Sequence, residues 1–168
     1  MVKLKRVFLL TGGNLGNRLE NLLQANQLIE KTAGHVKKVS GIYETEAWGV
    51  ENQPPYLNQA LEIETFLSPF QLLDELQLIE NQLGRVRKNK WESRSMDIDI
   101  LFFSDLIIKT DRLTVPHPRM HRRNFALVPM MEIAPLWTHP LFGKTMEDLF
   151  FQSIDTAEVK LLDNAFAG

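Results

Sequence analysis

Two carboxylates, Asp97 and Asp99, lie two residues apart inside the apolar run from Met96 to Phe103. In a β-strand, side chains i and i+2 share one face, so these two acids point the same way. Two carboxylates on one face repel each other unless a cation lies between them. Magnesium suits this arrangement because it takes oxygen ligands from one or two carboxylates and the rest from water and phosphate. The pair therefore predicts a metal site, with two solvated acids at a strand end as the alternative.

A basic segment immediately precedes the carboxylate pair. Residues 85–94 hold five Lys or Arg and one Glu, a local charge of 5 − 1 = +4 in a chain of net charge −2. The segment has neither helical nor strand periodicity, so we expect a loop. Phosphoryl transfer needs a metal held by carboxylates and basic side chains that neutralise phosphate oxygens in the transition state. A solvated charged loop is the alternative.

A second basic cluster extends from Arg112 to Arg123. His117 lies between two prolines, which predict a fixed turn, and a helix over 119–131 would place Arg119 and Arg123 four residues apart on one face. Like charges at this spacing destabilise a helix unless an anion bridges them. The cluster is consistent with a phosphate site or with a solvated basic turn.

A third pair is suited to a different ligand. Tyr56 and Asn58 are also spaced i, i+2, so they share one face of the strand expected at 56–66. An aromatic ring beside an amide can bind a planar heterocycle, because the ring stacks on it and the amide pairs with its polar edge. A cross-strand aromatic side chain in the core would have the same spacing.

The composition excludes several other chemistries. The chain has 168 residues, no cysteine, and 19 basic against 21 acidic residues. Disulfides, thiolate metal sites and cysteine nucleophiles are therefore excluded, and near-neutral charge disfavours a general nucleic-acid or membrane-surface binder. No apolar run approaches the roughly 20 residues of a membrane span, and the N-terminal run is too short for a signal peptide. We expect a single domain over 1–168 in the cytoplasm.

The elements that must position these residues follow from the apolar periodicity and from two capping signals at helix starts, Asn17 with Glu20 and Ser68 with Gln71. Strands are expected at 7–10, 36–43, 56–66 and 96–103, and helices at 17–33 and 68–84, with short helices and loops in the last third. This β-α-β-β-α-β order predicts an α+β protein with a ferredoxin-like, mixed or antiparallel sheet and helices packed on both faces, a three-layer α/β/α arrangement. On the last strand, strict alternation would put Phe103 on the acid-bearing face and Phe102 on the opposite one.

The sequence resembles the hydroxymethyl-dihydropterin pyrophosphokinase family of folate biosynthesis in an ordered set of motifs. These are Arg85-Val86-Arg87, Trp91, Arg94-x-x-Asp97-Ile98-Asp99-Ile100-Leu101 and Leu113-Thr114-Val115-Pro116-His117-Pro118-Arg119-Met120, with Gly12-x-Asn14-Leu15-Gly16, Tyr56-Leu57-Asn58-x-Ala60 and Glu132-Ile133-Ala134-Pro135 in support. Together they cover nearly the whole chain.

The resemblance implies a transfer of pyrophosphate from ATP to 6-hydroxymethyl-7,8-dihydropterin, with release of AMP. It implies two Mg²⁺ ions at Asp97 and Asp99, and catalytic roles for these acids and for Arg85 and Arg94. The residues that match ATP-binding positions are Gln77, Glu80, Arg85, Lys88, Trp91, Arg94, Ile100, Arg112, Thr114, His117 and Arg123. Those that match pterin-binding positions are Thr45, Trp48, Tyr56, Asn58 and Phe125.

The sequence departs from the family pattern in three places. Gly13 replaces the usual serine of G-S-N, Thr45-Glu46-Ala47-Trp48-Gly49 replaces T-P-x-x-G, and Glu92-Ser93-Arg94 replaces G-P-R. The partners implied are small molecules, without nucleic acid or membrane, and a monomer is expected. Two alternatives stay open: a ferredoxin-like RNA-binding module using the basic loops, and a magnesium-dependent nucleotide hydrolase.

Overall fold

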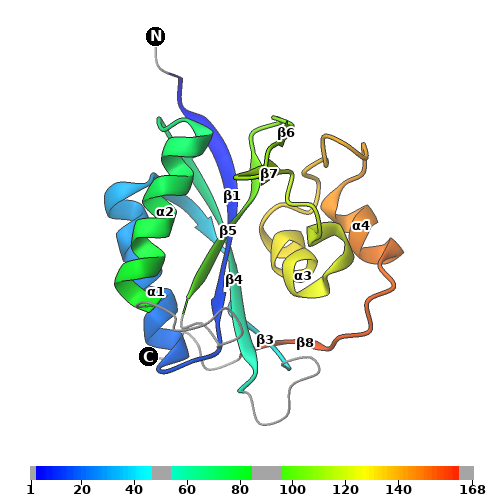
Figure 1. Ribbon diagram of the computed structural model, residues 1–168. Coiled ribbons are helices and arrows are strands. Elements are labelled where there is room, and N and C mark those ends of the chain that lie inside the picture. Colours follow the sequence, from blue (N-terminus) through cyan, green and yellow to red (C-terminus); the bar gives the residue numbers. More distant parts are fainter. Residues whose placement is uncertain (1–2, 47–53, 85–95, 163–168) are drawn as a thin grey trace.

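A computed structural model describes residues 3–46, 54–84 and 96–162 (Figure 1). Its elements in chain order are β1 (Lys5–Gly13), α1 (Arg18–Thr32), β2 (His35–Val39), β3 (Tyr43–Thr45), β4 (Tyr56–Thr65), α2 (Pro69–Gly84), β5 (Asp97–Phe103), β6 (Ile108–Lys109), β7 (Thr114–Val115), the 3-10 helix η1 (Met120–Arg122), α3 (Asn124–Ile133), α4 (Met146–Gln152) and β8 (Val159–Leu161). The strands β6 and β7 form a separate small hairpin.

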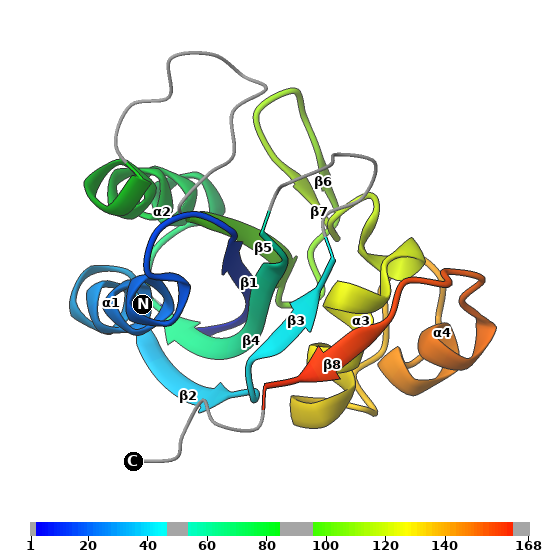
Figure 2. The same ribbon diagram turned by 90° about the horizontal axis from the view of Figure 1, so that it is seen from below.

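The main sheet has the predicted ferredoxin-like topology. Within the described residues it has six strands in the order β5-β1-β4-β3-β8, and β2 also pairs with β4. Every pair in this sheet is antiparallel. The unit β1-α1-β2-β4-α2-β5 supplies the β-α-β-β-α-β pattern, and β3 and β8 extend it at one side, where Figure 2 shows them next to each other.

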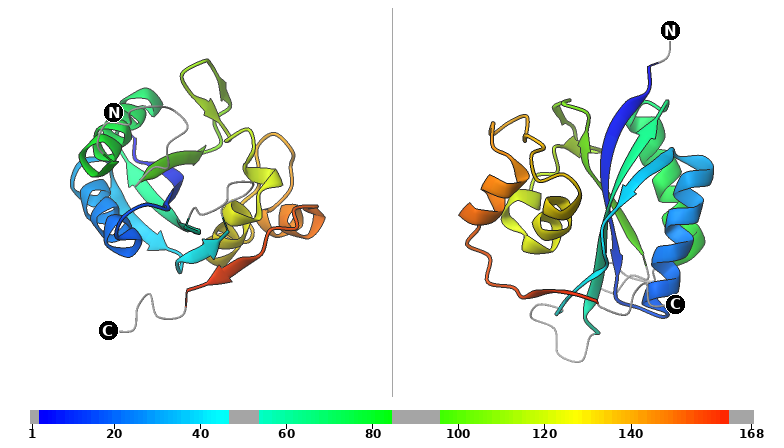
Figure 3. Two further views of the ribbon diagram at one scale, coloured as in Figure 1. Left: turned by 60° about the horizontal axis from the view of Figure 1, so that its bottom comes forward. Right: turned by 180° about the vertical axis from the view of Figure 1, so that it is seen from behind.

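Helices cover both faces of the sheet, as expected for three layers. The helices α1 and α2 lie on one face and α3 and α4 on the other (Figures 1 and 3). Each face has its own buried apolar cluster, one including Leu22, Leu72 and Ile98, the other including Phe8 and Leu127. None of the helices in the three described ranges is long and apolar enough to cross a membrane.

Side-chain caps fix the starts of both helices on the first face. Asn17 is the N-cap of α1, and its side chain accepts a hydrogen bond from the Glu20 amide at 3.1 Å. Before α2, the Gln71 amide donates to Ser68 Oγ at 3.3 Å and the Ser68 amide donates to Gln71 Oε1 at 2.9 Å. This reciprocal pair is the capping box that the spacing predicts.

The single strand expected at 36–43 is wrong, because the chain forms two strands, β2 and β3, on either side of Ser40. Ser40 Oγ accepts a hydrogen bond from the Ala60 amide at 2.9 Å, and the Ser40 amide donates to the Ala60 carbonyl, also at 2.9 Å. The Ser40 carbonyl accepts a third bond, from Gln59 Nε2 at 2.7 Å. A side-chain hydroxyl thus replaces a backbone acceptor, and the register with β4 changes between β2 and β3.

The alternation expected along β5 fails after Leu101. Phe102 is buried with Leu101 in the cluster under α3, whereas Phe103 belongs to the cluster under α1 and α2. The pairing register with β1 shifts between Phe8 and Leu9, where the partners change from Phe102 to Ile100. This bulge gives β5 one extra residue and exchanges the faces of the two phenylalanines, while the two acids keep a common face.

A buried histidine makes stability depend on pH. His139 is 1% exposed, and its Nδ1 accepts hydrogen bonds from the Leu141 and Phe142 amides. Its ring stacks on that of Phe142, with the ring centres 4.2 Å apart. Burial, and to a smaller extent nearby His121, lowers its pKa to about 4. Between that value and the unfolded pKa of about 6.5, the unfolded chain binds more protons, so stability falls as pH falls.

We therefore expect the free energy of unfolding to be about 2 kcal/mol lower at pH 5 than at pH 7.5 through His139 alone. Urea unfolding at both pH values measures this change. His139→Asn keeps a hydrogen-bond acceptor and should remove that part of the pH dependence, whereas His35→Asn, at an exposed histidine, should retain it. An unchanged pH dependence in His139→Asn would contradict the assignment.

Candidate active site

A cleft of about 1550 Å³ is lined by residues of the sheet and of the segments that form α3 and α4. Gly12 of β1 pairs with Asp97 of β5 on one side and with Asn58 of β4 on the other, so three adjacent strands form its floor. The residues that line it are Leu10, Gly12, Thr45, Glu46, Tyr56, Asn58, Asp97, Asp99, His121, Arg122, Arg123, Phe125, Leu141, Phe142, Lys144, Leu149, Gln152, Ser153, Ile154, Asp155 and Ala157. The two acids, Asp97 and Asp99, and the ring-and-amide pair, Tyr56 and Asn58, thus line one cavity.

The two acids lie together at the start of β5, as the spacing predicts. Asp97 is half-buried, Asp99 is exposed, and both line the cleft. The backbone between them is fixed by α2, because the Ile98 amide donates a hydrogen bond to Glu80 Oε2 at 2.8 Å. The Glu80 carboxylate thus satisfies a backbone amide of β5, the strand at the end of the order β5-β1-β4-β3-β8. Glu80 therefore positions the acid pair from the opposite face of the sheet.

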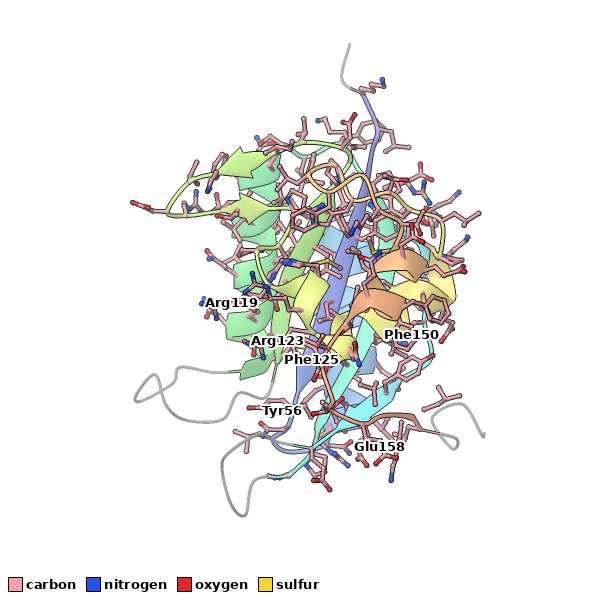
Figure 4. The ribbon with its side chains drawn as sticks, turned by 90° about the vertical axis from the view of Figure 1, so that its right-hand side faces the viewer. Tyr56, Arg119, Arg123, Phe125, Phe150 and Glu158 are labelled. Carbon is pink, nitrogen blue, oxygen red and sulfur yellow. The ribbon has the colours of Figure 1, made fainter. Side chains whose placement is uncertain are left out.

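Two aromatic rings approach the cleft from different layers. Tyr56 begins β4 in the sheet and Phe125 lies in the first turn of α3 (Figure 4). Asn58 Nδ2 donates to the Thr11 carbonyl at 3.3 Å, which fixes the amide beside the rings. Thr45 pairs with Tyr56 across the sheet, and its buried hydroxyl has no hydrogen-bond partner among the described residues. Such a hydroxyl is available to a ligand.

A smaller cavity of about 210 Å³ lies beside Asp99 and is lined by part of the basic cluster. It is lined by Asp99, His117, Arg119, Arg123 and Phe125, together with four apolar residues. A hydrogen bond holds the segment around His117 against β5, because the His117 amide donates to the Leu101 carbonyl at 2.9 Å. Cationic side chains next to a carboxylate pair form an environment suited to a metal-bound polyphosphate.

The surroundings of His117 in this cavity favour its neutral form. Burial lowers its pKa, and the positive charges of Arg119 and Arg123 lower it further. Its Nδ1 accepts a hydrogen bond from the Arg119 amide at 3.1 Å, so Nε2 carries the proton. The ring can therefore donate one hydrogen bond to a phosphate oxygen without adding charge.

The helix expected over 119–131 is wrong at its start. The chain forms the short helix η1, then Arg123 in an extended conformation (φ −126°, ψ 111°), and only then α3. Arg119 and Arg123 therefore do not share a helix face. They line the same small cavity because the break turns the chain between them. Figure 4 labels Arg119, Arg123 and Phe125, which all line this cavity.

Of the other predicted nucleotide residues, those that the structure describes lie outside both cavities. Ile100 is buried under α2, Thr114 is half-buried in β7, and Gln77 is exposed on α2. Arg112 pairs with Asp74 of α2 and lies over the Phe70 ring. Five further predicted residues fall outside the described residues: Trp48, Arg85, Lys88, Trp91 and Arg94.

Sequence reasoning missed several parts of the lining, among them Gly12, Leu141, Phe142, Lys144, Leu149, Gln152 and the segment from Ser153 to Ala157. Gly12 lies at the centre of the floor, and its position next to a second glycine at the end of an apolar strand was a usable signal of close approach. The segment from Ser153 to Ala157 lines the cleft without any regular element. It has no apolar periodicity, so nothing in the sequence placed it there.

Gly12→Ala is expected to impair ligand binding and stability together. A Cβ at this position would collide with the Asn58 side chain and lie 2.7 Å from the Leu57 carbonyl oxygen. The Asn58 amide must then move, and overpacking of this kind costs about 1–3 kcal/mol. Thermal unfolding measures the loss of stability, and the affinity for a ligand of the cleft measures the loss of binding. Gly143→Ala is a control for stability alone, because its Cβ would meet open space although its φ of +64° is strained.

The chain is similar in sequence to a family of known proteins. A sequence model of the family described as 7,8-dihydro-6-hydroxymethylpterin-pyrophosphokinase (HPPK) matches residues 8–135. The 2-amino-4-hydroxy-6-hydroxymethyldihydropteridine pyrophosphokinase of Aquifex aeolicus is 39% identical over 142 residues, 84% of this chain and 88% of that protein. The protein of the same name from Bacillus subtilis is 48% identical over 127 residues, 75% of this chain and 76% of that protein.

Solved structures with the same fold include the wild-type HPPK-DHPS of Plasmodium falciparum with pteroate. The TM-score is 0.73 at 17% identity, over 89% of this chain and 44% of that one. The present chain thus spans less than half of that longer protein, and the likeness shows the fold alone. Family membership rests on the sequence matches, which cover most of both partners. The chain belongs to the 7,8-dihydro-6-hydroxymethylpterin-pyrophosphokinase family.

Proposed function

We propose that this protein transfers the pyrophosphate group of ATP to 6-hydroxymethyl-7,8-dihydropterin in folate biosynthesis, giving AMP and the pterin diphosphate. One observation carries the proposal beyond family membership: a carboxylate pair and a ring-and-amide pair face the same cleft from strands that flank Gly12. A phosphate donor and a planar acceptor can therefore bind side by side. The curated relatives named above are pyrophosphokinases of this pterin.

The pterin is proposed to lie between Tyr56 and Phe125. Both rings line the cleft, one from β4 and the other from α3, and stacking between aromatic rings suits a flat heterocycle. Asn58 and the unpartnered Thr45 hydroxyl supply polar groups for its edge. The fifth residue of this set, Trp48, is proposed from the family resemblance alone.

The residues present fit magnesium, because two carboxylates on one strand face open to a cavity with room for phosphate and water. Asp97 and Asp99 would hold two ions. When bound, Mg²⁺ neutralises phosphate charge and makes the phosphorus more electrophilic. His117 and Arg123 would contact phosphate oxygens from the adjoining cavity. The resemblance adds Arg85 and Arg94 as catalytic residues, and Gln77, Glu80, Lys88, Trp91, Ile100, Arg112 and Thr114 as nucleotide neighbours.

The chain's own residues act by position and charge. The pterin hydroxymethyl oxygen forms a bond to the β-phosphorus, and the bond from that phosphorus to the α,β-bridging oxygen breaks, so AMP leaves with this oxygen. The hydroxyl proton passes to water. Stacking by Tyr56 and Phe125 holds the acceptor in line, and Arg123 and His117 stabilise charge on the transferred group. No side chain is assigned as general base.

An AMP-release assay with ATP, Mg²⁺ and the pterin, each omitted in turn, tests the proposal. AMP should form only when all three are present, in amounts equal to the pterin diphosphate. AMP release without the pterin would instead indicate a nucleotide hydrolase. Absence of AMP in the complete mixture, together with salt-dependent RNA binding, would overturn the proposal in favour of a binding module.

A further inference from the structure

The helix α3 begins without a cap of its own. Its N-cap residue, Arg123, makes no side-chain capping bond. The missing acceptor is Asp155, which lies 31 residues after Asn124. The Asn124 amide donates to Asp155 Oδ2 at 2.8 Å. Asn124 Nδ2 also donates to the Asp155 carbonyl at 3.2 Å. A carboxylate at a helix N-terminus both satisfies an unpaired amide and opposes the helix dipole.

Asp155 is itself held by the segment that carries it. Its second carboxylate oxygen accepts from the Ala157 amide at 2.9 Å, and its amide donates to Ser153 Oγ at 3.2 Å. The segment continues into β8, whose Val159 pairs with Thr45 of β3. Figures 1 and 4 show it running from α4 to β8. It lies beyond residues 8–135, which the family comparison matches.

The turn that Asp155 caps carries two residues of the cleft. Arg123 precedes Asn124 and Phe125 follows it, and both line the two cavities. We propose that Asp155 is a positioning residue, which sets the distance of Phe125 from Tyr56 by fixing the first turn of α3. This inference rests on the proposed function, because it assigns Phe125 to the pterin.

The other end of α3 offers a matched control. Glu132 accepts bonds from the Gly41 amide, at 3.0 Å to each carboxylate oxygen, and from the Tyr43 hydroxyl at 2.6 Å. Like Asp155, it is a carboxylate that ties α3 to another part of the chain. It lies seven residues after Phe125 and lines neither cavity. Removal of either carboxylate should lower stability, but only removal of Asp155 should change pterin affinity.

The experiment compares Asp155→Ala, Asp155→Asn and Glu132→Ala in the full chain. In Asp155→Ala we expect the KM and the dissociation constant for the pterin to rise about tenfold. Without the cap, the first turn of α3 spends less time in the conformation that binds the pterin. At saturating substrates kcat should change by less than about threefold, since binding restores that arrangement. Asp155→Asn keeps one acceptor for the Asn124 amide but turns its NH₂ group toward the Ala157 amide, so its pterin KM should lie between those of the wild type and Asp155→Ala. Glu132→Ala should leave the pterin KM unchanged.

Hydrogen exchange at the Asn124 amide provides a readout that needs no activity. It should be about tenfold faster in Asp155→Ala and unchanged in Glu132→Ala. Unchanged exchange in Asp155→Ala, or an equal rise in pterin KM in Glu132→Ala, would overturn the inference. Equal losses in Asp155→Ala and Asp155→Asn, with unchanged exchange, would also overturn it and indicate direct contact with substrate. Failure of the wild type to form AMP would refute the proposed function. The exchange rates would still show whether Asp155 caps α3.

Discussion

Asp97→Asn or Asp99→Asn is expected to lower kcat by at least about a thousandfold while leaving the fold intact. Asparagine has nearly the size of aspartate, so the change removes charge without creating a cavity. The neutral amide cannot neutralise a cation, and its NH₂ group cannot ligate one. AMP release at saturating ATP and pterin measures the loss. A second readout is the rise in Tm on addition of ATP and Mg²⁺, which should shrink in both variants.

Asp105→Asn is the matched control for this pair. Asp105 is exposed in the turn just after β5 and lines neither cavity. Its replacement changes the net charge by the same amount and should leave kcat within about twofold of the wild-type value. AMP release at the wild-type rate in either Asp97→Asn or Asp99→Asn would refute the metal assignment.

Arg123→Ala is expected to lower kcat/KM for ATP by about a hundredfold or more. Arg123 lines the cavity that contains Asp99 and His117, and its guanidinium lies 6.0 Å from the centre of the Phe125 ring. It makes no capping bond to α3, so its removal should not unfold the helix. Steady-state kinetics at fixed pterin concentration measure the effect.

Arg123→Lys separates charge from geometry. Lysine keeps the positive charge but lacks the planar fork that binds two phosphate oxygens at once, so we expect partial recovery. Lys109→Ala removes an exposed cation of β6 outside both cavities and should change kcat/KM by less than about twofold. Comparable losses in Arg123→Ala and Lys109→Ala would show that only the overall charge matters.

Much of the fold and part of the site follow from local sequence rules. Spacing alone placed Asp97 with Asp99 and Tyr56 with Asn58, because a strand repeats every two residues whatever its partners are. Capping chemistry likewise located the starts of α1 and α2. These features depend on a few adjacent residues, so they can be predicted without knowledge of the neighbours.

The features that the sequence did not predict depend on distant partners. Ser40 ends β2 because its hydroxyl meets the Ala60 amide, and the faces of Phe102 and Phe103 exchange because β5 slips against β1. The cap of α3 comes from Asp155, far along the chain. No local pattern records such contacts, since each is fixed only when the two segments pack.

The contacts around β5 also bear on self-association. An edge strand with unpaired amides and carbonyls can add a strand from another molecule and so start aggregation. On β5, the Ile98 amide donates to the Glu80 carboxylate and the Leu101 carbonyl accepts from the His117 amide, so neither group is open to another strand. At the opposite edge, β8 is only three residues long, with Lys160 at its centre. The groups that shape the side of the cleft proposed to bind metal and phosphate therefore also block strand addition. Variants that release Glu80 or His117 should be prone to aggregate.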